Sequence, residues 1–417
     1  MQETKINLIT LKKNILKLWI DTSSDIPRVG KEFTFSDKLK SEHKLDENLN
    51  KILDALEQLI SSDNENMMMK KNLIKVFSEY FMSSCEDDFK EIEIIEEFIN
   101  QFSVLTEEFM RASREFDENI SMEDIVQALR NVWAMGLFQW ITFEKVTLTK
   151  SLFAYSMLYP YTDNYLDDPN ISTEQKKKFN EGVARKLKGY SETTSSKKVR
   201  QVFKLIELIE EEFPRETYTE LYEVMSAMQE AQERSLIQHG DVKIDERELL
   251  DISVQKGGLS VLLHGYLVKG TVSLEEASFL YSFGVVLQIC DDIQDVLEDM
   301  NNNHNTIVTK VGYKWNLDYI TNNLMNFSYK MFTYIKENDK NKNIWMWNLI
   351  ETKVLNMIFF AICRNRKLYS KDYVKSICSY FPYRIIYIRT INFKMNRRIR
   401  RIKRKVGKKS IEELILI

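Results

Sequence analysis

The chain has 417 residues, of which 44% are hydrophobic, and a formal net charge of −3. Only 12 glycines and 5 prolines occur, and this shortage of helix breakers argues for long helices with few tight turns. No run of alternating polar and apolar residues lies between turn dipeptides, so the sequence predicts an all-α fold and excludes a β architecture. The length is sufficient for one large or two ordinary domains.

The four cysteines show no CxxC spacing and no regular framework. This pattern is typical of a reducing compartment and excludes a disulfide scaffold or a cysteine-based zinc site. The first residues, MQETKINLITLKKN, lack the apolar core of a signal peptide. The apolar run after Trp345 is interrupted by Glu351 and Lys353 and is too short to span a bilayer. We therefore expect a cytoplasmic protein.

The sequence pattern of residues 1–143 predicts helices and the loops between them. Residues 1–45 show weak periodicity, which indicates one short helix and a loop. From residue 45 to about 101, apolar residues recur at intervals of three and four, as in helical hairpins. Ser121 has the pattern of a helix N-cap, with Asp124 three residues later. A strongly apolar helix is expected to follow over 125–143.

An apolar helix predicted over 146–165 leads into a first cluster of carboxylates. This first cluster consists of Asp163, Asp167 and Asp168. Asp163 and Asp167 are four residues apart, so a helix places them on one face. Pro169 is expected to end the helix, because the residue before a proline avoids the α region.

A second cluster of carboxylates, Asp291, Asp295 and Asp299, ends the stretch FGVVLQICDDIQDVLED over 283–299. The spacing of four and eight residues stacks these side chains on one side of a helix, with Asp292 off that face. Stacked carboxylates repel each other, more strongly when dry. A buried helix that ends in such a stack requires a counter-charge, which a hard divalent cation supplies. The simpler alternative is an amphipathic helix with a solvated acidic end.

Further helices are expected between the two clusters and beyond them. Periodicity predicts helices over 199–212, 216–238 and 245–269. Ser273 is a predicted N-cap for the helix that leads into the second cluster. A loop is expected over 301–304, directly after that cluster. The prediction is therefore of two apolar helices that both end in carboxylates and face a common cavity.

Four ordered stretches over about 152–310 resemble the class I isoprenoid synthases, the trans-prenyl diphosphate synthases and terpene synthases. DNYLD resembles their first aspartate-rich motif, DDxxD, with Asn164 in place of the second aspartate. QICDDIQD resembles the second aspartate-rich motif. AMQEAQ (227–232) and QKGGLSVLLHGYLVKG (255–270) resemble the helices that carry a glutamine and a lysine near the substrate diphosphate.

The resemblance implies an isoprenoid synthase-type helical bundle with a central cavity, plus extra N-terminal helices. We place an N-terminal helical extension at 1–120, the synthase-like domain at 121–380 and a basic C-terminal tail at 381–417. It also implies Mg²⁺, with Mn²⁺ as a substitute, held against the diphosphate of a prenyl diphosphate substrate. The implied metal ligands are Asp163, Asp167, Asp291 and Asp295, with Asp168 and Asp299 as second choices.

The resemblance further implies residues that contact the diphosphate or act in catalysis. Lys256 and Gln232 match the lysine and the glutamine of the family helices, although Ser235 stands where prenyl synthases have aspartate. Arg247 lies where terpene synthases place a diphosphate-sensing arginine. Lys310 follows the second cluster, where family members carry a late lysine. The alternative for Lys256 and Arg247 is an ordinary solvated side chain.

The acceptor half of a chain-elongating synthase is missing from the sequence. Such enzymes carry an early basic motif, GGKRxRP, for isopentenyl diphosphate, and no such stretch precedes Asp163. This favours a terpene synthase-like reaction, in which ionisation is followed by cyclisation or elimination with release of diphosphate. A prenyl diphosphate synthase that adds isopentenyl diphosphate and a non-catalytic helical binding subunit are the alternatives. A homodimer is left open.

The end of the chain is strongly basic. Residues 384–409 contain twelve Lys and Arg and no acidic residue, with Ile, Phe and Tyr interleaved. An anionic membrane surface would attract this charge, and so would nucleic acid, the less favoured partner. The third account is that the tail folds back onto the acidic remainder of the chain.

Overall fold

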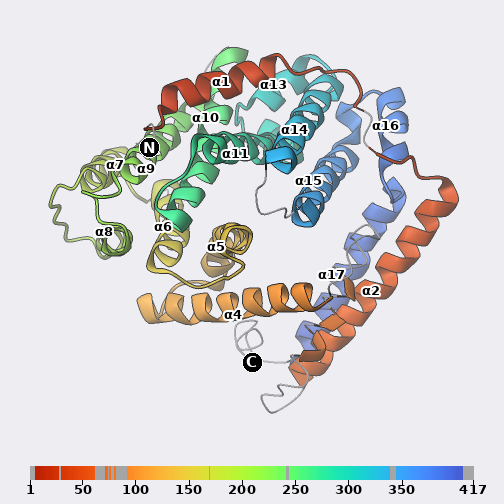
Figure 1. Cartoon of the computed structure of the whole chain (residues 1–417), viewed down its shortest axis with the longest axis horizontal. Coiled ribbons are helices and arrows are strands. Elements are labelled where there is room, and N and C mark those ends of the chain that lie inside the picture. Colours follow the sequence, from red (N-terminus) through yellow and green to blue (C-terminus); the bar gives the residue numbers. More distant parts are fainter. Residues whose placement is uncertain are drawn as a thin grey trace. The chain divides into compact units, whose positions relative to one another are not determined.

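The computed structural model describes residues 5–27, 30–61, 71–73, 75–76, 79–80, 92–168, 170–240, 244–338 and 344–406. Within these ranges the chain consists of α-helices and short 3₁₀ turns, with no strand (Figure 1), which confirms the predicted all-α class. The chain divides into two compact units. Unit 1 combines Met1–Ile20 with Gln101–Gln288, and unit 2 combines Asp21–Asn100 with Ile289–Ile417. The division runs through α4 (Ile92–Phe116) and α11 (Leu274–Gln294).

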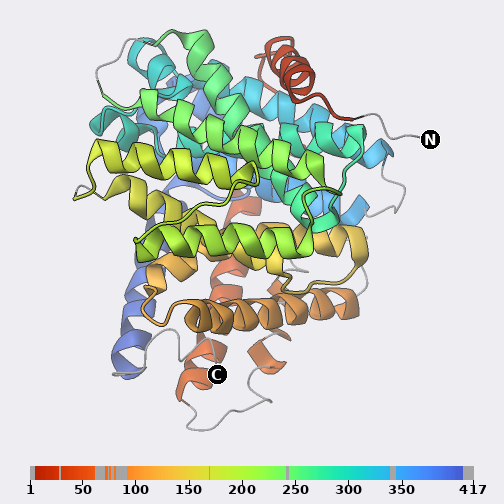
Figure 2. The same ribbon diagram turned by 90° about the vertical axis from the view of Figure 1, so that its left-hand side faces the viewer.

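Two apolar helices, α6 and α10, form the centre of unit 1. α6 packs against α5, α8 and α10, and α10 also contacts α1, α5 and α9. Figure 2 shows the yellow and green helices of this unit side by side, with similar axis directions. The elements are α1 (Leu8–Ile20), α5 (Met122–Phe143), α6 (Lys150–Asp167), α7 (Thr173–Leu187), α8 (Lys197–Glu212), α9 (Thr219–Ser235), η1 (Leu236–Gln238) and α10 (Glu246–Lys269).

The helix starts predicted from the sequence are present. The hydroxyl of Ser121 accepts a hydrogen bond from the amide of Asp124 at 3.0 Å, and α5 begins at the next residue, Met122. Ser273 accepts from the amide of Glu276 at 3.2 Å and donates its own amide to the Glu276 carboxylate at 2.8 Å. This reciprocal pair satisfies two amides that the first turn of α11 leaves without helical partners.

Glycines allow α10 and α11 to approach closely. A Cβ atom on Gly257 would lie 2.6 Å from the carbonyl oxygen of Gly284, and a Cβ on Gly258 would overlap the ring of Tyr281. Any side chain at these positions would therefore force the helices apart. Gly257 and Gly258 therefore serve the packing of α10 against α11.

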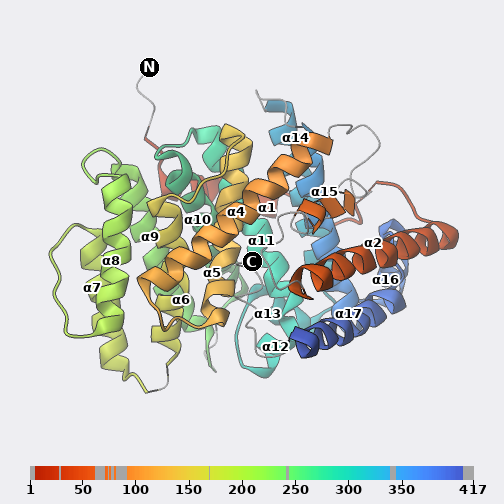
Figure 3. The same cartoon turned by 90° about the horizontal axis from the view of Figure 1, so that it is seen from below.

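Unit 2 is built from segments far apart in the chain. α15 packs against α14 and α17, and α17 packs along α2; Figures 1 and 3 both show α2 and α17 side by side. The elements are α2 (Phe35–Ser61), α12 (Val296–Asn301), α13 (Ile307–Lys314), α14 (Asp318–Asn338), α15 (Ile344–Arg364), η2 (Arg366–Leu368), α16 (Lys371–Ile377), η3 (Cys378–Tyr380) and α17 (Ile385–Val406).

One helix corrects the expectation that every apolar run is too short for a bilayer. α15 has 21 residues and is long and apolar enough to cross a membrane by length and composition, with 50% of its most apolar window buried inside the protein. Ile350, Val354 and Ile358 are among its buried residues, a spacing that also fits a core helix. The charge of Glu351 is matched by an ion pair with Lys336 of α14.

Candidate functional site

The first carboxylate cluster stands at the end of α6. The side chain of Thr149 caps this helix by accepting from the amide of Leu152 at 3.2 Å, and the helix then buries Leu152 and Met157. Asp163 is half-buried in the penultimate turn, and Asp167 is the last helical residue. The side chain of Asp167 lies outside the described part. The backbone thus brings Asp163 and Asp167 to one end of α6, one turn apart, as predicted.

The carboxylate of Asp168 forms hydrogen bonds within the turn that follows α6. Its Oδ1 atom accepts from the backbone amide of Asn170 at 2.9 Å and from the Asn170 side chain at 3.0 Å. Lys198 Nζ lies 3.9 Å from its other oxygen. The hydrogen bonds from Asn170, followed by the lysine charge, hold the pKa of Asp168 below its usual value. Pro169 lies outside the described residues, and α6 ends two positions before it.

Two further carboxylates lie beside the end of α6. Asn164, the departure from the DDxxD pattern, donates to Asp124 Oδ1 at 2.6 Å. Tyr161 and Gln201 donate to Asp117 Oδ2 at 2.9 and 2.8 Å. Burial alone would raise the pKa of Asp117, but these two hydrogen bonds outweigh it and leave the pKa lowered. This group could not be recognised from the sequence, because only the packing of α5 and α8 on α6 brings its members together.

The second cluster spans the break between α11 and α12: Asp291 lies in the last turn of α11, and Asp295 is the non-helical residue before α12. The amide of Asp295 donates to the carbonyl of Asp291 at 3.0 Å, and the amide of Asp299 to the carbonyl of Asp295 at 2.9 Å. The predicted spacing of one turn is therefore kept, although α11 ends at Gln294 and α12 begins at Val296. Asp291 is exposed, whereas Asp295 and Asp299 are half-buried.

The end of α11 is held in place by a buried amide. Asn365 Nδ2 donates to the carbonyl of Ile293 at 2.7 Å and to that of Gln294 at 3.1 Å. These carbonyls belong to the last turn of α11, which lacks helical donors. Ile293 and Asn365 are buried, and so is Asp292, at 5% exposure. The buried contacts of Asn365 therefore fix the helix end from which Asp291, Asp295 and Asp299 extend.

Two basic side chains, Arg364 and His304, lie against the second cluster. Arg364 Nη1 lies 3.5 Å from Asp295 Oδ1, and His304 Nδ1 lies 3.1 Å from Asp299 Oδ1. Arg364 therefore supplies part of the counter-charge that the sequence led us to expect from a metal ion. Among the described residues, no group of three or more His, Cys, Asp or Glu side chains is arranged to hold a metal ion.

A pocket in unit 2 adjoins the second cluster through Arg364. Its volume is about 510 Å³, within the usual range for small-ligand sites. Apolar groups of α15 and α17 form most of the wall, and Arg364 and Arg389 add two positive charges. The lining residues are Gln294, Met357, Phe360, Ala361, Cys363, Arg364, Ile388 and Arg389. The arginine that pairs with Asp295 thus also lines an apolar pocket.

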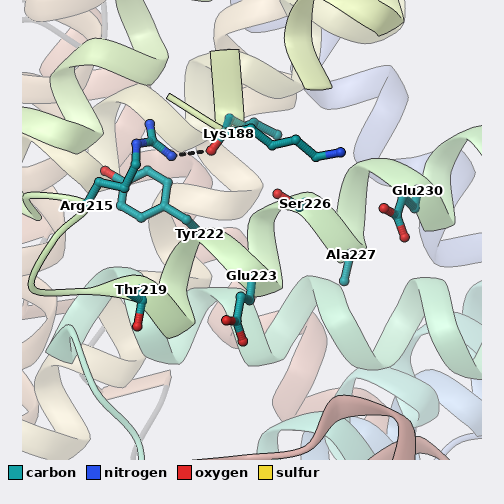
Figure 4. A pocket seen from close by; sticks show the side chains of 9 residues that line it. Lys188, Arg215, Thr219, Tyr222, Glu223, Ser226, Ala227 and Glu230 are labelled. Atoms are coloured by element: carbon teal, nitrogen blue, oxygen red, sulfur yellow. Dashed lines mark hydrogen bonds between the residues drawn. The ribbon is translucent and has the colours of Figure 1, made fainter. Parts of the chain in front are cut away.

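A second pocket, of about 420 Å³, lies in unit 1 between the end of α7 and one face of α9. Figure 4 shows Glu223, Ser226 and Glu230 along that face. The guanidinium of Arg215 lies 3.9 Å from the ring centroid of Tyr222 and donates to the carbonyl of Leu187. None of the site residues predicted from the sequence lines this pocket.

The predicted cations and the predicted glutamine have separate positions. Lys256 is half-buried on α10, Arg247 is exposed in the first turn of that helix, and Gln232 is half-buried near the end of α9. All three share unit 1 with the first cluster. Lys310 is half-buried on α13 and shares unit 2 with the second cluster. That the two clusters face one cavity stays a prediction.

A polar network at the junction of α1, α9 and α10 was not identified from the sequence. Arg234 forms an ion pair with Asp251 and donates to Gln255 Oε1 at 3.0 Å. Lys12 Nζ lies 2.9 Å from Asp251 Oδ2. Burial would raise the pKa of Asp251, but the bonds from Arg234 and Lys12 outweigh it and lower the pKa. The network attaches α1 to the helices that carry Gln232 and Lys256.

Comparison with known proteins does not place the chain in a family. No protein-family model matches the chain, and no curated protein matches it in sequence.

Proposed function

We propose that the chain is an isoprenoid synthase-like enzyme that ionises an allylic prenyl diphosphate with the help of Mg²⁺. Ionisation is followed by cyclisation or elimination within the same substrate, with release of diphosphate. The proposal rests on the resemblance of four ordered motifs. The observation that carries it is the position of Arg364, between Asp295 of the second motif and an apolar pocket of about 510 Å³.

The residues that line the pocket beside Arg364 match the chemical requirements of this reaction. An allylic diphosphate has an apolar body and an anionic leaving group, so departure requires cations more than a base. Apolar walls from Met357 and Phe360 suit the body, and Arg364 and Arg389 suit the diphosphate. Lys310 is the further candidate in unit 2, and Lys256 and Arg247 are the candidates in unit 1.

The carboxylates of the second cluster fit a magnesium ion by their chemistry. Mg²⁺ prefers carboxylate oxygens together with substrate phosphates and water. The contacts from Arg364 and His304 reach the Oδ1 atoms of Asp295 and Asp299, and we assign Asp291 and the Oδ2 atom of Asp295 to the metal, with substrate phosphate and water as its other ligands. When bound, the metal stabilises the negative charge that develops on the leaving group.

A second candidate function is a non-catalytic binding subunit. The ion pair that Arg364 forms with Asp295 favours it, because a protein that supplies its own counter-charge has less need of a metal. The two candidates differ in one property. A catalyst consumes its prenyl diphosphate and requires the metal, whereas a binding subunit returns it unchanged.

The deciding experiment is an assay of the full chain with ten-, fifteen- and twenty-carbon allylic diphosphates. Each substrate is incubated with Mg²⁺ or with a chelator, and products are identified by mass spectrometry. We expect a hydrocarbon or alcohol and free diphosphate from one chain length, in the Mg²⁺ reaction only. A longer prenyl diphosphate formed after addition of isopentenyl diphosphate would assign a chain-elongating synthase. Retention of every substrate unchanged would contradict both enzymatic readings.

A further inference from the structure

α17 has an inner face that is fixed to α2 by charge. Arg384 Nε donates to both carboxylate oxygens of Glu42 at 2.9 Å, and Glu42 is only 4% exposed. The hydroxyl of Tyr387 donates to Asp46 Oδ1 at 2.9 Å. Further along, Arg398 donates to Asn50 Oδ1 at 2.9 Å. The start of the basic segment therefore folds back onto an acidic row of α2, as the third account of the tail predicts.

The outer face of α17 carries a different set of side chains. Ile386 and Phe393 are 66% and 71% exposed, and Arg389, Arg397 and Arg400 are exposed as well. These five residues follow one another at intervals of three and four, so they form one stripe along the helix. We call Ile386, Arg389, Phe393, Arg397 and Arg400 the outer stripe. The pairing with α2 fixes which side of α17 is the outer one.

We propose that the outer stripe binds an anionic membrane surface. A helix that lies in the membrane interface places large apolar side chains at the boundary between headgroups and acyl chains, and its basic side chains at the lipid phosphates. The stripe has both kinds of residue in alternation. α17 contains no acidic residue within Ile385–Val406, so nothing on the helix itself opposes the attraction of anionic lipids.

The apolar members of the stripe favour a membrane over nucleic acid. A phosphate backbone attracts arginines through charge alone and offers no apolar medium for Ile386 and Phe393. A lipid surface accepts both. The membrane also explains why two large apolar side chains remain exposed on a helix whose opposite side buries Tyr387, Ile388 and Ile391. The inference shares Arg389 with the catalytic proposal, but Ile386, Phe393, Arg397 and Arg400 do not line the pocket, so the variants below test the membrane role separately.

Sedimentation of the full chain with lipid vesicles tests the proposal. Phosphatidylcholine vesicles with and without phosphatidylserine are compared at low and at high salt. We expect binding to the anionic vesicles that weakens with salt. The variant I386S/F393S should lose binding at both salt concentrations. R397Q/R400Q should bind about tenfold or more weakly at low salt, since each basic residue near the surface contributes roughly fivefold.

Matched variants elsewhere on the chain distinguish binding by the outer stripe from nonspecific binding through surface charge or exposed apolar side chains. K177Q/K178Q on α7 removes the same charge from exposed positions, and I9S on α1 removes an exposed apolar side chain. Both should bind like the unmodified chain, and circular dichroism checks that each variant folds. Equal losses in these controls would overturn the proposal. So would binding of duplex DNA without vesicle binding, or a dimer that dissociates in I386S/F393S without vesicle binding.

Discussion

His264 of α10 meets the ring of Tyr155 of α6 edge-on, with 5.5 Å between the ring centroids. His264 is buried, and neither of its ring nitrogens has a hydrogen-bond partner among the described residues. Burial lowers the pKa of His264 to about 4. The interior of unit 1 therefore holds a neutral imidazole that makes an aromatic contact and no polar one.

The stability of the protein should depend on pH through His264. The pKa of this group is lower in the folded protein, about 4, than the ordinary 6.5 of the unfolded chain. The stability that the neutral His264 contributes to the folded state is therefore complete above pH 6.5 and is lost as the pH falls towards 4. We expect a loss of about 2 to 3 kcal/mol in the free energy of unfolding. Urea titrations at pH 7 and near pH 4.5 measure it.

Two substitutions isolate this effect from other acid-sensitive groups. H264L should flatten the pH dependence by that amount, because leucine has no proton to gain. H43Q, at a histidine whose side chain is 78% exposed, should leave the dependence unchanged. If H264L loses as much stability on acidification as the unmodified chain, His264 is not the cause.

Replacement of a glycine between α10 and α11 should destabilise unit 1. A Cβ atom on Gly257 meets the carbonyl oxygen of Gly284 at 2.6 Å, and backbone cannot move aside as a side chain can. G257A is expected to cost about 2 to 3 kcal/mol, the upper range for overpacked sites. G182A on α7 is the control, because its Cβ meets only the edge of Phe203, at 3.3 Å. Chemical denaturation compares the two, and equal stabilities would contradict the packing argument.

Loss of a carboxylate from the second cluster should remove activity while the fold remains. D291N and D295N should lower the turnover of an allylic diphosphate by roughly 10² to 10⁴, since each removes a ligand that stabilises the leaving group. E298Q changes an exposed carboxylate on α12, three residues after Asp295, and should have little effect. Full activity of D295N in Mg²⁺, or of the unmodified enzyme in chelator, would contradict the assigned role.

Cys378 should be more reactive than Cys363. A hydrogen bond between the two thiols lowers the pKa of Cys378 and raises that of Cys363, and Lys38 adds to the lowering. Cys378 is also half-exposed, whereas Cys363 is buried. Alkylation at several pH values, followed by peptide mass mapping, should modify Cys378 first. C363A should shift its reaction to higher pH, and an unchanged profile would mean that the thiol contact has no effect.

Local patterns carried most of what could be predicted from the sequence. Ser121 and Ser273 mark helix starts correctly because a cap depends on residues within one turn. The one-turn ladder of Asp291 and Asp295 is equally local. By contrast, the partner of Asp295 is Arg364, which lies 69 residues further on (364 minus 295) and on a different helix. In a chain with 59 Lys and Arg, no local pattern singles out one arginine.

The same limit explains the missed ion pairs and polar groups. Glu351 interrupts the apolar run in the sequence, but its partner Lys336 lies on a different helix. Asp251 meets Lys12 across 239 positions, and only the packing of α1 on α10 brings them together. Contacts of this kind follow from tertiary packing, which composition and periodicity do not encode.

The ion pair between Glu42 and Arg384 spans 342 positions, and this separation sets an order of assembly during synthesis. α2 leaves the ribosome well before α17, the helix that covers its acidic row. Domains tend to fold as they emerge, so Gln101–Gln288 can collapse while α2 still waits for α17. Docking of α17 on α2 then follows the folding of the segment between them and carries a high entropic cost of loop closure. This docking of the basic helix completes the fold of unit 2.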